Sequence, residues 1–382
     1  MRTENHDIAI IGGGPAGAAY AIYLSGLGID VCLVEKKKFP REVICGEFLS
    51  GEVIESLAEM NLTDNFFSLS PNQIRSVKFI FDDKGTAAST LSFPAYSLRR
   101  STFDYFLLNA AKQNGTNIIQ PAEVKEICRD GKIFKMKIKR QEGDEVQISS
   151  AILAAAYGKQ NVLDKYLERS FTGVRTNYYG VKFHIDKRLF KHFEDSEIRM
   201  YSSPGVYCGL NAVDNNMVNL CFLRNRRDNS ESSKDFLYNF ISRIKSLEEL
   251  FYPSYEQELK SISKFGTANI YFGKRQKVEN GVFMIGDSAG MIAPLSGDGI
   301  AMAFQSAKLL AVISMDIING KIKRNKAEEL YSSEWNYLFR KRKFAASIIQ
   351  KIILNNPYRN AIKYFVKFND SILPDLIKIT RG

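Results

Sequence analysis

Histidine, cysteine and tryptophan are scarce in this chain, and their spacing excludes several classes of protein. Its three histidines and five cysteines form neither a His-Glu-x-x-His nor a Cys-x-x-Cys pattern, so we expect no protein-ligated metal. Unpatterned cysteines also make no disulfide framework, which favours a reduced, cytoplasmic protein. No apolar stretch reaches the roughly 18 residues that a membrane-spanning helix needs, so no transmembrane segment is expected.

The remaining composition is that of a globular protein with a basic surface. Of the 382 residues, 45% are hydrophobic and 25% are charged, which suffices for a large core and for two domains. The net charge of +11 at pH 7 is compatible with nucleic acid, anionic lipid or acidic substrates. A solvated basic surface is the simpler interpretation, and no nucleic-acid partner is expected.

A glycine pattern near the N-terminus predicts a dinucleotide site. Gly12-x-Gly14-x-x-Gly17 follows an apolar strand at 7–11 and opens a helix rich in small residues, and the next apolar strand, at 31–34, ends at Glu35. The three glycines permit the tight turn, the approach of a pyrophosphate and close packing of helix on strand. The helix N-terminus attracts phosphates, and Glu35 can accept hydrogen bonds from a ribose. The alternative is a glycine-rich turn that binds nothing.

A second glycine-rich segment, about 270 residues further on, indicates FAD rather than NAD. A buried strand at 282–285 ends in Gly286-Asp287, where a carboxylate can meet the ribityl hydroxyls. The segment PLSGDGIAMAFQSAKLLAVISMDII then reads as a tight loop that opens a long helix, whose positive end would face the flavin pyrimidine. Gly297 and Gly299 would let the flavin ring lie against the backbone. FAD has to be held at both of its ends, which explains two such segments.

Four segments of the sequence match the motifs of a known flavoprotein group. They are IIGGGPAGAAYA, VEKKKFPREVICGEFLS, LRRSTFDYFLLNAA and GDSAGMIAPLSGDGIAMAFQSAKLLA, in the family's order over about residues 7–310. Together they resemble the FAD-dependent oxidoreductases of the para-hydroxybenzoate hydroxylase superfamily, closest to its geranylgeranyl reductase-like branch. The resemblance implies an α/β fold, α+β overall, with a Rossmann-like FAD-binding domain, an inserted β-sheet substrate domain and C-terminal helices.

The resemblance also implies which residues hold the cofactor. Those implied near the pyrophosphate and the adenosine are Gly12, Gly14, Pro15, Ala16, Gly17, Glu35, Lys36 and Val124. Those implied elsewhere on the cofactor, chiefly around the ribityl chain and the isoalloxazine ring, are Arg41, Cys45, Gly46, Arg100, Gly286, Asp287, Pro294, Gly297, Asp298, Gly299 and Ile300. Cys45 is also the candidate catalytic residue, as a proton donor or a substrate-contact thiol. The alternative for Cys45 is a small buried hydrophobe.

The sequence departs from the superfamily at several positions. Tyr157-Gly158 stands where an Asp-Gly pair is usual, which puts a carboxylate role there in doubt. Of the Tyr-x-Trp-x-Phe-Pro substrate motif of prenyl reductases, only Tyr207 remains, in the segment GVYCGLNAV. Trp335 is the single tryptophan, so the Trp-x-Trp motif of flavin halogenases is missing and halogenation is disfavoured.

The chain is expected to divide into a discontinuous FAD-binding domain, an inserted sheet domain and a helical end. The predicted FAD-binding pieces are 1–70, 98–172 and 266–325, and the predicted substrate-domain pieces are 71–97 and 173–265. Alternating apolar residues predict hairpins around 82–85 and at 133–150, and strands at 180–185, 198–201, 205–210 and 217–223. One helix is predicted at 232–250. Residues 326–382 are predicted to be helical and basic, either packed on the FAD-binding domain or in contact with a membrane surface.

Several individual residues have two interpretations. Glu47 contacts the flavin region or, as favoured, caps a helix that begins near Ser50. His184 shows no partner in the sequence, so a sheet or surface role is favoured. Core positions are favoured for three of the cysteines, namely Cys32, Cys208 and Cys221. Four tyrosines form either an aromatic substrate wall or ordinary strand positions, namely Tyr178, Tyr179, Tyr201 and Tyr207.

These observations predict an FAD-dependent oxidoreductase that acts on an apolar small molecule. In the favoured version, reduced flavin gives hydride to a carbon–carbon double bond of a prenyl or polyene-like substrate. The alternatives are a monooxygenase that hydroxylates an aromatic or polyketide-like substrate, and a non-catalytic module that binds FAD. No second Gly-x-Gly-x-x-Gly is present, so NAD(P)H would bind transiently or another reduced carrier would supply electrons.

Overall fold

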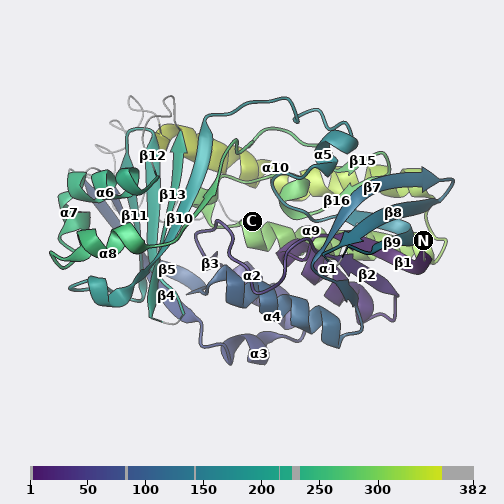
Figure 1. Ribbon diagram of the computed structural model, residues 1–382, viewed down its shortest axis with the longest axis horizontal. Helices are drawn as coiled ribbons and strands as arrows, with labels where there is room; N and C mark the ends of the chain where they lie inside the picture. The colour runs from purple at the N-terminus through teal and green to yellow at the C-terminus, as the bar shows by residue number, and fades with distance from the viewer. Residues whose placement is uncertain (1–2, 82–84, 142, 215, 226–232, 355–382) are drawn as a thin grey trace.

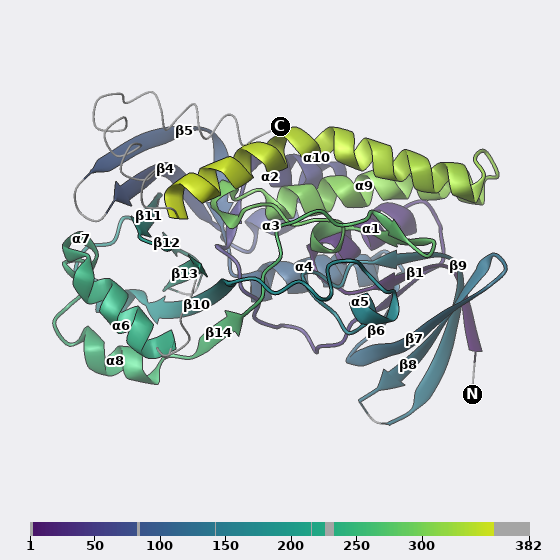
Figure 2. The ribbon, with the colours of Figure 1, turned by 90° about the horizontal axis from the view of Figure 1, so that it is seen from above.

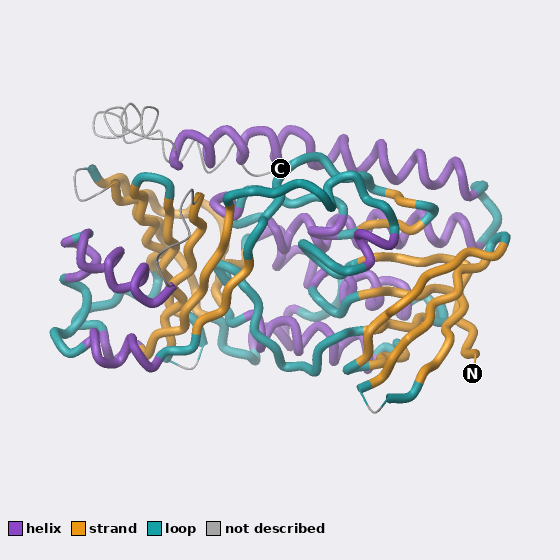
Figure 3. Tube along the Cα trace, turned by 45° about the horizontal axis from the view of Figure 1, so that its top comes forward, coloured by secondary structure: helices purple, strands orange, loops and turns teal. Residues whose placement is uncertain are grey.

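Two β-sheets stand side by side in the chain, each with its own covering helices (Figure 1, Figure 3). The computed structural model describes residues 3–81, 85–141, 143–214, 216–225 and 233–354. Strands and helices are both plentiful, and the predicted mixed α/β class is confirmed. The predicted turn at 82–84 and the end of the predicted helical segment, 355–382, lie outside the described residues.

The first sheet carries the N-terminal glycine motif. Its order is β15-β16-β9-β1-β2-β6, and β8 and β7 extend from β9 as an antiparallel meander. The strands from β16 to β6 run parallel, which accounts for the unbroken apolar runs at 8–11 and 31–34. The strands are β1 (Thr3–Ile11), β2 (Val31–Val34), β6 (Asn117–Ile119), β7 (Ala122–Asp130), β8 (Ile133–Arg140), β9 (Glu145–Ala155), β15 (Val278–Glu279) and β16 (Val282–Met284).

The second sheet has one face on its own helices and the other toward the first sheet (Figure 1). Its order is β14-β10-β13-β12-β11-β4-β5-β3. Because side chains alternate along a strand, Val181 and Phe183 of β10 join the core with the helices, while Lys182 points the other way. The strands are β3 (Phe48–Leu49), β4 (Asn72–Phe81), β5 (Thr86–Ser97), β10 (Tyr178–Asp186), β11 (Glu197–Ser203), β12 (Val206–Ala212), β13 (Met217–Asn225) and β14 (Lys264–Thr267).

The longest helices pack together beside the first sheet. Tyr20 of α1 and Ser314 of α9 share a 2.6 Å hydrogen bond between their hydroxyls. The α-helices are α1 (Pro15–Ser25), α2 (Gly51–Glu59), α3 (Thr63–Phe67), α4 (Arg100–Gln113), α5 (Leu163–Tyr166), α6 (Ser233–Arg243), α7 (Lys245–Glu248), α8 (Tyr255–Ser261), α9 (Gly299–Ile318) and α10 (Arg324–Leu354). Single 3₁₀ turns are η1 (Lys187–Leu189), η2 (Gly286–Ser288) and η3 (Pro294–Ser296).

Helix α9 corrects one expectation from the sequence. Among the described residues it is the one helix long and apolar enough to cross a membrane, although no such stretch was expected. It packs against α1, α2 and α10, and 61% of its apolar window is buried inside the protein. A helix in a protein core can be as long and as apolar as a membrane-spanning helix, and α9 is packed like a core helix.

Helix α10 runs along α9 and ends against the second sheet (Figure 2). The basic run 340–343 lies within it, but Arg342 is buried and forms a bidentate ion pair with Glu52, at 2.9 and 3.0 Å. Part of this basic run is therefore a structural contact with α2. Contact of this helix with a membrane stays a prediction.

Three local details differ from the sequence-based expectation. The single helix predicted at 232–250 is two helices, α6 and α7, because Ile244 adopts an extended backbone between them. Strand β3 belongs to the second sheet, although its residues were assigned to the FAD-binding domain. Strand β14 crosses the predicted boundary at 265/266 and also belongs to the second sheet.

Replacing Gly17 with alanine should destabilise the protein and loosen its N-terminal loop. A Cβ atom at Gly17 would lie 1.9 Å from the Gly12 carbonyl oxygen, a backbone atom that cannot turn aside. Overpacking of this kind costs about 1–3 kcal/mol. Urea unfolding should show that loss for Gly17→Ala, while Gly173→Ala, whose Cβ meets no atom within 4 Å, should match the parent. Equal midpoints for both variants would contradict the packing argument.

Candidate functional site

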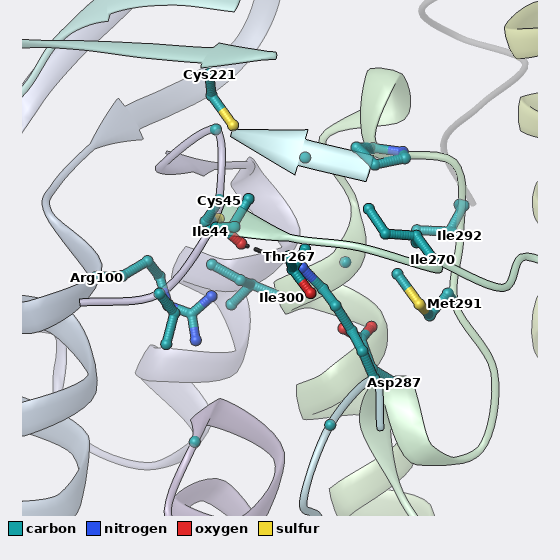
Figure 4. A pocket seen from close by; sticks show the side chains of 18 of the residues that line it. Ile44, Cys45, Arg100, Cys221, Thr267, Ile270, Asp287, Met291, Ile292 and Ile300 are labelled. Carbon is teal, nitrogen blue, oxygen red and sulfur yellow. Dashed lines mark hydrogen bonds between the residues drawn. The ribbon is translucent and has the colours of Figure 1, made fainter. Parts of the chain in front are cut away.

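A cavity of about 1240 Å³ lies between the two sheets. It exceeds the roughly 300–1,000 Å³ of a typical single-ligand pocket. One end is lined by the N-terminal glycine loop and the other by apolar side chains of the second sheet and of α10. Figure 4 shows Cys45, Arg100 and Asp287 around this space, each from a different part of the chain. The cavity therefore has room for a large cofactor and a second molecule.

The N-terminal loop is shaped by close backbone contacts. Gly12 has a φ of +107°, and a Cβ there would lie 2.5 Å from the carbonyl oxygen of Ala156. The Glu35 carboxylate accepts the backbone N–H of Gly13 at 2.7 Å and of Lys37 at 2.8 Å. Glu35 thus fixes the loop and also lines the cavity. A glycine cradle at a helix N-terminus with a carboxylate beside it fits the diphosphate and ribose of a dinucleotide.

Arg41 supplies positive charge over this loop. Its guanidinium lies 4.5 Å from the Phe39 ring centre, and its nitrogens lie 3.8 Å from Glu35 and 3.5 Å from Asp104. One guanidinium nitrogen is 3.5 Å from the position that a Cβ on Gly14 would occupy. A diphosphate resting on Gly14 would therefore meet this cation.

The second glycine segment touches the first. Gly286 has a φ of +59°, and a Cβ there would lie 2.8 Å from the Cβ of Ala16. The Gly286 N–H donates to the Ser306 hydroxyl of α9 at 3.0 Å. Gly297, with a φ of +72°, brings the loop before α9 against the Phe48 ring. The two loops predicted to hold opposite ends of FAD therefore meet at one cavity.

Most of the predicted cofactor residues line that cavity. They are Gly12, Gly14, Pro15, Ala16, Glu35, Lys36, Arg41, Cys45, Gly46, Arg100, Val124, Gly286, Asp287, Pro294, Gly297, Gly299 and Ile300. Two predicted residues, Gly17 and Asp298, are buried and do not line the cavity, and their contact with the cofactor stays a prediction. Tyr157, which stands where the resemblance leads one to expect an aspartate, also lines the cavity, and its hydroxyl donates to Asp164 at 2.8 Å.

A model of the FAD binding domain family matches residues 5–334 of the chain. The chain belongs to this family. The digeranylgeranylglycerophospholipid reductase of Thermoplasma volcanium is 24% identical over 335 residues, which cover 82% of this chain and 79% of that protein. The 1H-pyrrole-2-carbonyl-[peptidyl-carrier protein] chlorinase of Pseudomonas fluorescens is 21% identical over 361 residues, 85% of this chain and 78% of that one. The superfamily and branch to which the sequence was compared are confirmed.

Solved structures agree with this family at the level of the fold. A flavoprotein/dehydrogenase from Cytophaga hutchinsonii superposes with a TM-score of 0.76, at 19% identity, and the match covers 99% of both chains. The predicted FAD-binding architecture is confirmed. The protein is an FAD-dependent oxidoreductase, and its residues fit that cofactor at both ends of the cavity.

A charged cluster beside Cys45 was missed at the sequence level. The Lys182 ammonium lies 2.7 Å from Glu42 and 2.9 Å from Glu47, and His184 Nε2 lies 2.7 Å from Glu47. Burial opposes the charge on Lys182, but the two carboxylates raise its pKa above the usual value. Glu42, Glu47 and His184 have the spacing of metal ligands, yet the Lys182 ammonium already binds both carboxylates. The cluster is therefore an ion-pair network.

Two sequence-level interpretations change because of this cluster. Glu47 was expected to cap the helix near Ser50, but its carboxylate accepts the Arg100 N–H at the start of α4, at 2.9 Å. His184 was expected in a sheet or surface role, and it does lie on β10, where it also has a partner, Glu47, that the sequence did not indicate. Alternation along β10 could have indicated that Lys182 and His184 share a face, but not what that face meets.

The cysteines and tyrosines are divided between core and cavity. Cys32 and Cys208 are buried, as favoured, whereas Cys221 lines the cavity rather than a core. Burial raises the pKa of Cys221 to about 12, so it stays a thiol. Of the four tyrosines, Tyr207 lines the cavity, while Tyr201 belongs to the core under the helices.

A group of cations lies behind Asp287. The Lys277 ammonium donates to the Ala289 carbonyl oxygen at 2.8 Å and lies 3.9 Å from the Trp335 ring centre. Burial, with Lys343 nearby, lowers the pKa of Lys277 to about 7. Burial and Arg275 lower the pKa of Lys343 to about 8. The loop that presents Asp287 is therefore backed by two lysines that lose their charge at lower pH than an exposed lysine does.

Replacing Asp287 with alanine should weaken FAD retention. The carboxylate lines the cavity where the ribityl chain would lie, and a hydrogen bond to a charged group contributes about 1.5–3 kcal/mol. We expect the dissociation constant of FAD to rise by about 10- to 100-fold, measured by flavin fluorescence on titration of apoprotein. Asp316→Ala, near the far end of α9, should keep the parent value. Unchanged flavin content in Asp287→Ala would remove Asp287 from the site.

Stability should rise with pH through the titration of Lys277. An unfolded lysine keeps its proton to about pH 10.4, whereas the folded side chain loses it above about 7. Within that window the unfolded state binds more protons, so the free energy of unfolding increases with pH, by up to about 1 kcal/mol per unit. Lys277→Met should lack this part of the rise in urea unfolding. Parallel pH curves for parent and variant would contradict the assignment.

Proposed function

We propose that this oxidoreductase reduces carbon–carbon double bonds of an apolar, prenyl or polyene-like substrate. When bound and reduced, FAD supplies the hydride for such a reaction. The protein then has to hold an apolar chain beside the flavin and deliver a proton. A reductase relative with a prenyl-lipid name, at 24% identity over most of the chain, supports this choice.

The observation that carries the proposal is the apolar end of the cavity. Along β4 and β11 the inward side chains are aromatic, aliphatic or thioether, and helix α10 adds isoleucines from the other side. The apolar lining there comprises Val77, Phe79, Phe81, Leu91, Ile198, Met200, Tyr207, Leu223, Ile349, Ile352 and Ile353. Burying an aliphatic chain against such a surface contributes about 25 cal/mol per Å² of apolar area. A flexible hydrocarbon fits this end better than a charged or compact polar molecule.

The polar end of the cavity offers a proton donor. Cys45 lines the wall, and the Arg100 guanidinium lies beside its thiol. Burial lowers the pKa of Arg100, but Asp104 and the Cys45 thiol raise it more strongly, so Arg100 stays charged. In the proposed step the Cys45 S–H bond breaks and a C–H bond forms on the alkene carbon next to the one that receives the hydride. The thiolate left behind faces Arg100 and regains a proton from solvent.

The electron donor in this proposal is NAD(P)H or another reduced carrier. A nicotinamide would have to bind transiently, because the glycine cradle is taken by FAD. Each turnover takes two electrons from the donor, which one NAD(P)H or two one-electron carriers supply, and saturates one double bond.

Anaerobic turnover is the experiment that tests this function. Purified protein would be reduced with dithionite and mixed, without oxygen, with a geranylgeranyl lipid. We expect oxidised-flavin absorbance to return as the lipid gains one dihydrogen equivalent per turnover, read by mass spectrometry. A saturated prenyl lipid is the matched control and should leave the flavin reduced. Return of colour only with oxygen, together with a hydroxylated product, would contradict the reductase and favour a monooxygenase.

A further inference from the structure

Glu47 connects the loop that carries Cys45 to the second sheet. Its side chain is fully buried and both carboxylate oxygens are used. One oxygen accepts the Lys182 ammonium and the Arg100 backbone N–H, each at 2.9 Å, and the other lies 2.7 Å from His184. Its φ of +56° is unusual for a residue with a side chain. Such strain persists where surrounding contacts enforce it, often at functional sites.

The same residue also touches the Cys45 sulfur. The Glu47 backbone N–H donates to Cys45 Sγ at 3.3 Å, and the Cys45 carbonyl oxygen accepts the Asn219 side-chain amide at 3.3 Å. A donor aimed at sulfur favours the thiolate over the thiol. The position of Cys45 is therefore set by one contact from its own loop and one from the second sheet.

Lys182 reaches Glu47 because of its register in the sheet. On β10 the inward residues are Gly180, Lys182 and His184, and Lys182 pairs with Cys221 on β13. Lys182 is fully buried behind the two carboxylates that line the cavity. A buried ammonium in this place offsets the negative charge of the Cys45 loop.

The charged and titratable groups around the thiol come from five segments. They are Glu42 and Glu47 on its own loop, Arg100 and its partner Asp104 on α4, Lys182 and His184 on β10, Cys221 on β13, and Lys159 on the loop after β9, whose ammonium donates to the Ile44 carbonyl oxygen. Removing one charge from this balanced set changes the field at the sulfur.

We propose that Glu47 and Lys182 are positioning residues that set how readily Cys45 gives up its proton, with His184 holding the second carboxylate oxygen. Loss of Lys182 leaves Glu47 uncompensated beside the thiol and disfavours the thiolate. Loss of the Glu47 charge removes a negative charge beside the thiol, while Lys182 and Arg100 keep their positive charges, which favours the thiolate. The two changes therefore act in opposite directions. This proposal rests on the proposed function in one respect only, namely that the Cys45 proton goes to the substrate.

The test is the pH profile of Cys45 alkylation in the FAD-loaded protein without substrate. Iodoacetamide labelling would be followed by mass spectrometry of the Cys45 peptide, with the Cys128 peptide as an internal reference. In Lys182→Met, the pH at which the labelling rate of Cys45 reaches half its maximum should rise by about one unit. At pH values below this midpoint, labelling should then be about tenfold slower than in the parent. In Glu47→Gln the midpoint should fall by a similar amount, and the double variant should return to within about threefold of the parent.

Controls separate this effect from damage to the fold. Lys187→Met removes an ion pair with Asp195 in the same domain and should leave the Cys45 profile unchanged. FAD content and the urea midpoint are measured for every variant, and Glu47→Gln carries the test if Lys182→Met does not fold. Shifts of the same sign, or no shift in a variant that keeps its FAD, would overturn the proposal. If the labelling midpoint of Cys45 shifts in opposite directions in Lys182→Met and Glu47→Gln, but the protein reduces no alkene, the proposed function is refuted. The role of Glu47 and Lys182 in setting the reactivity of Cys45 then still stands.

Discussion

The contact between Gly286 and Ala16 fixes the geometry of the whole site. A side chain on Gly286 would overlap the Ala16 methyl group, so α1 and the turn after β16 can meet only because both residues are so small. The Tyr20–Ser314 hydrogen bond holds α1 against α9 further along. As a result the N-termini of two helices, which attract negative charge, open on one cavity. One extended anionic cofactor can then be held by both.

The polarity of the cavity follows from how the second sheet is laid over this site. One end of the sheet presents Lys182 and His184 toward the loop at 42–47, and the other end presents Phe79 and Met200 toward α10. A bound molecule would therefore have its reacting part near charged groups and its remainder in an apolar environment. Because the same strands bury Phe183 and Phe222 on their outer face, this arrangement is fixed by a second core.

Local patterns in the sequence predict only part of this site. Gly12, Glu35 and Asp287 were identified because each has a chemical reason to stand where it does relative to a neighbouring strand or helix. Lys182 and Glu47 are 135 residues apart, and nothing near either one indicates the other. Their pairing depends on the register of β10 and on how the second sheet lies against the loop at 42–47, which one sequence does not specify. For the same reason the break at Ile244 was missed, because helical spacing continues through it.

The position of the buried charges argues for function rather than stability. An interface between two domains can be held as well by apolar residues of the same volume, because desolvation usually offsets the attraction of a buried ion pair. The interface here nevertheless encloses two fully buried charged residues, Lys182 of β10 and Glu47. Glu47 has a strained backbone, and its N–H donates to the thiol that faces the cavity. Apolar residues in place of Lys182 and Glu47 would remove two of the charges that act on the Cys45 sulfur and leave that field to the remaining groups, Arg100 and Lys159 among them. In the proposed reaction the ion pair would control that field, and proton transfer from Cys45 is the step that would depend on it.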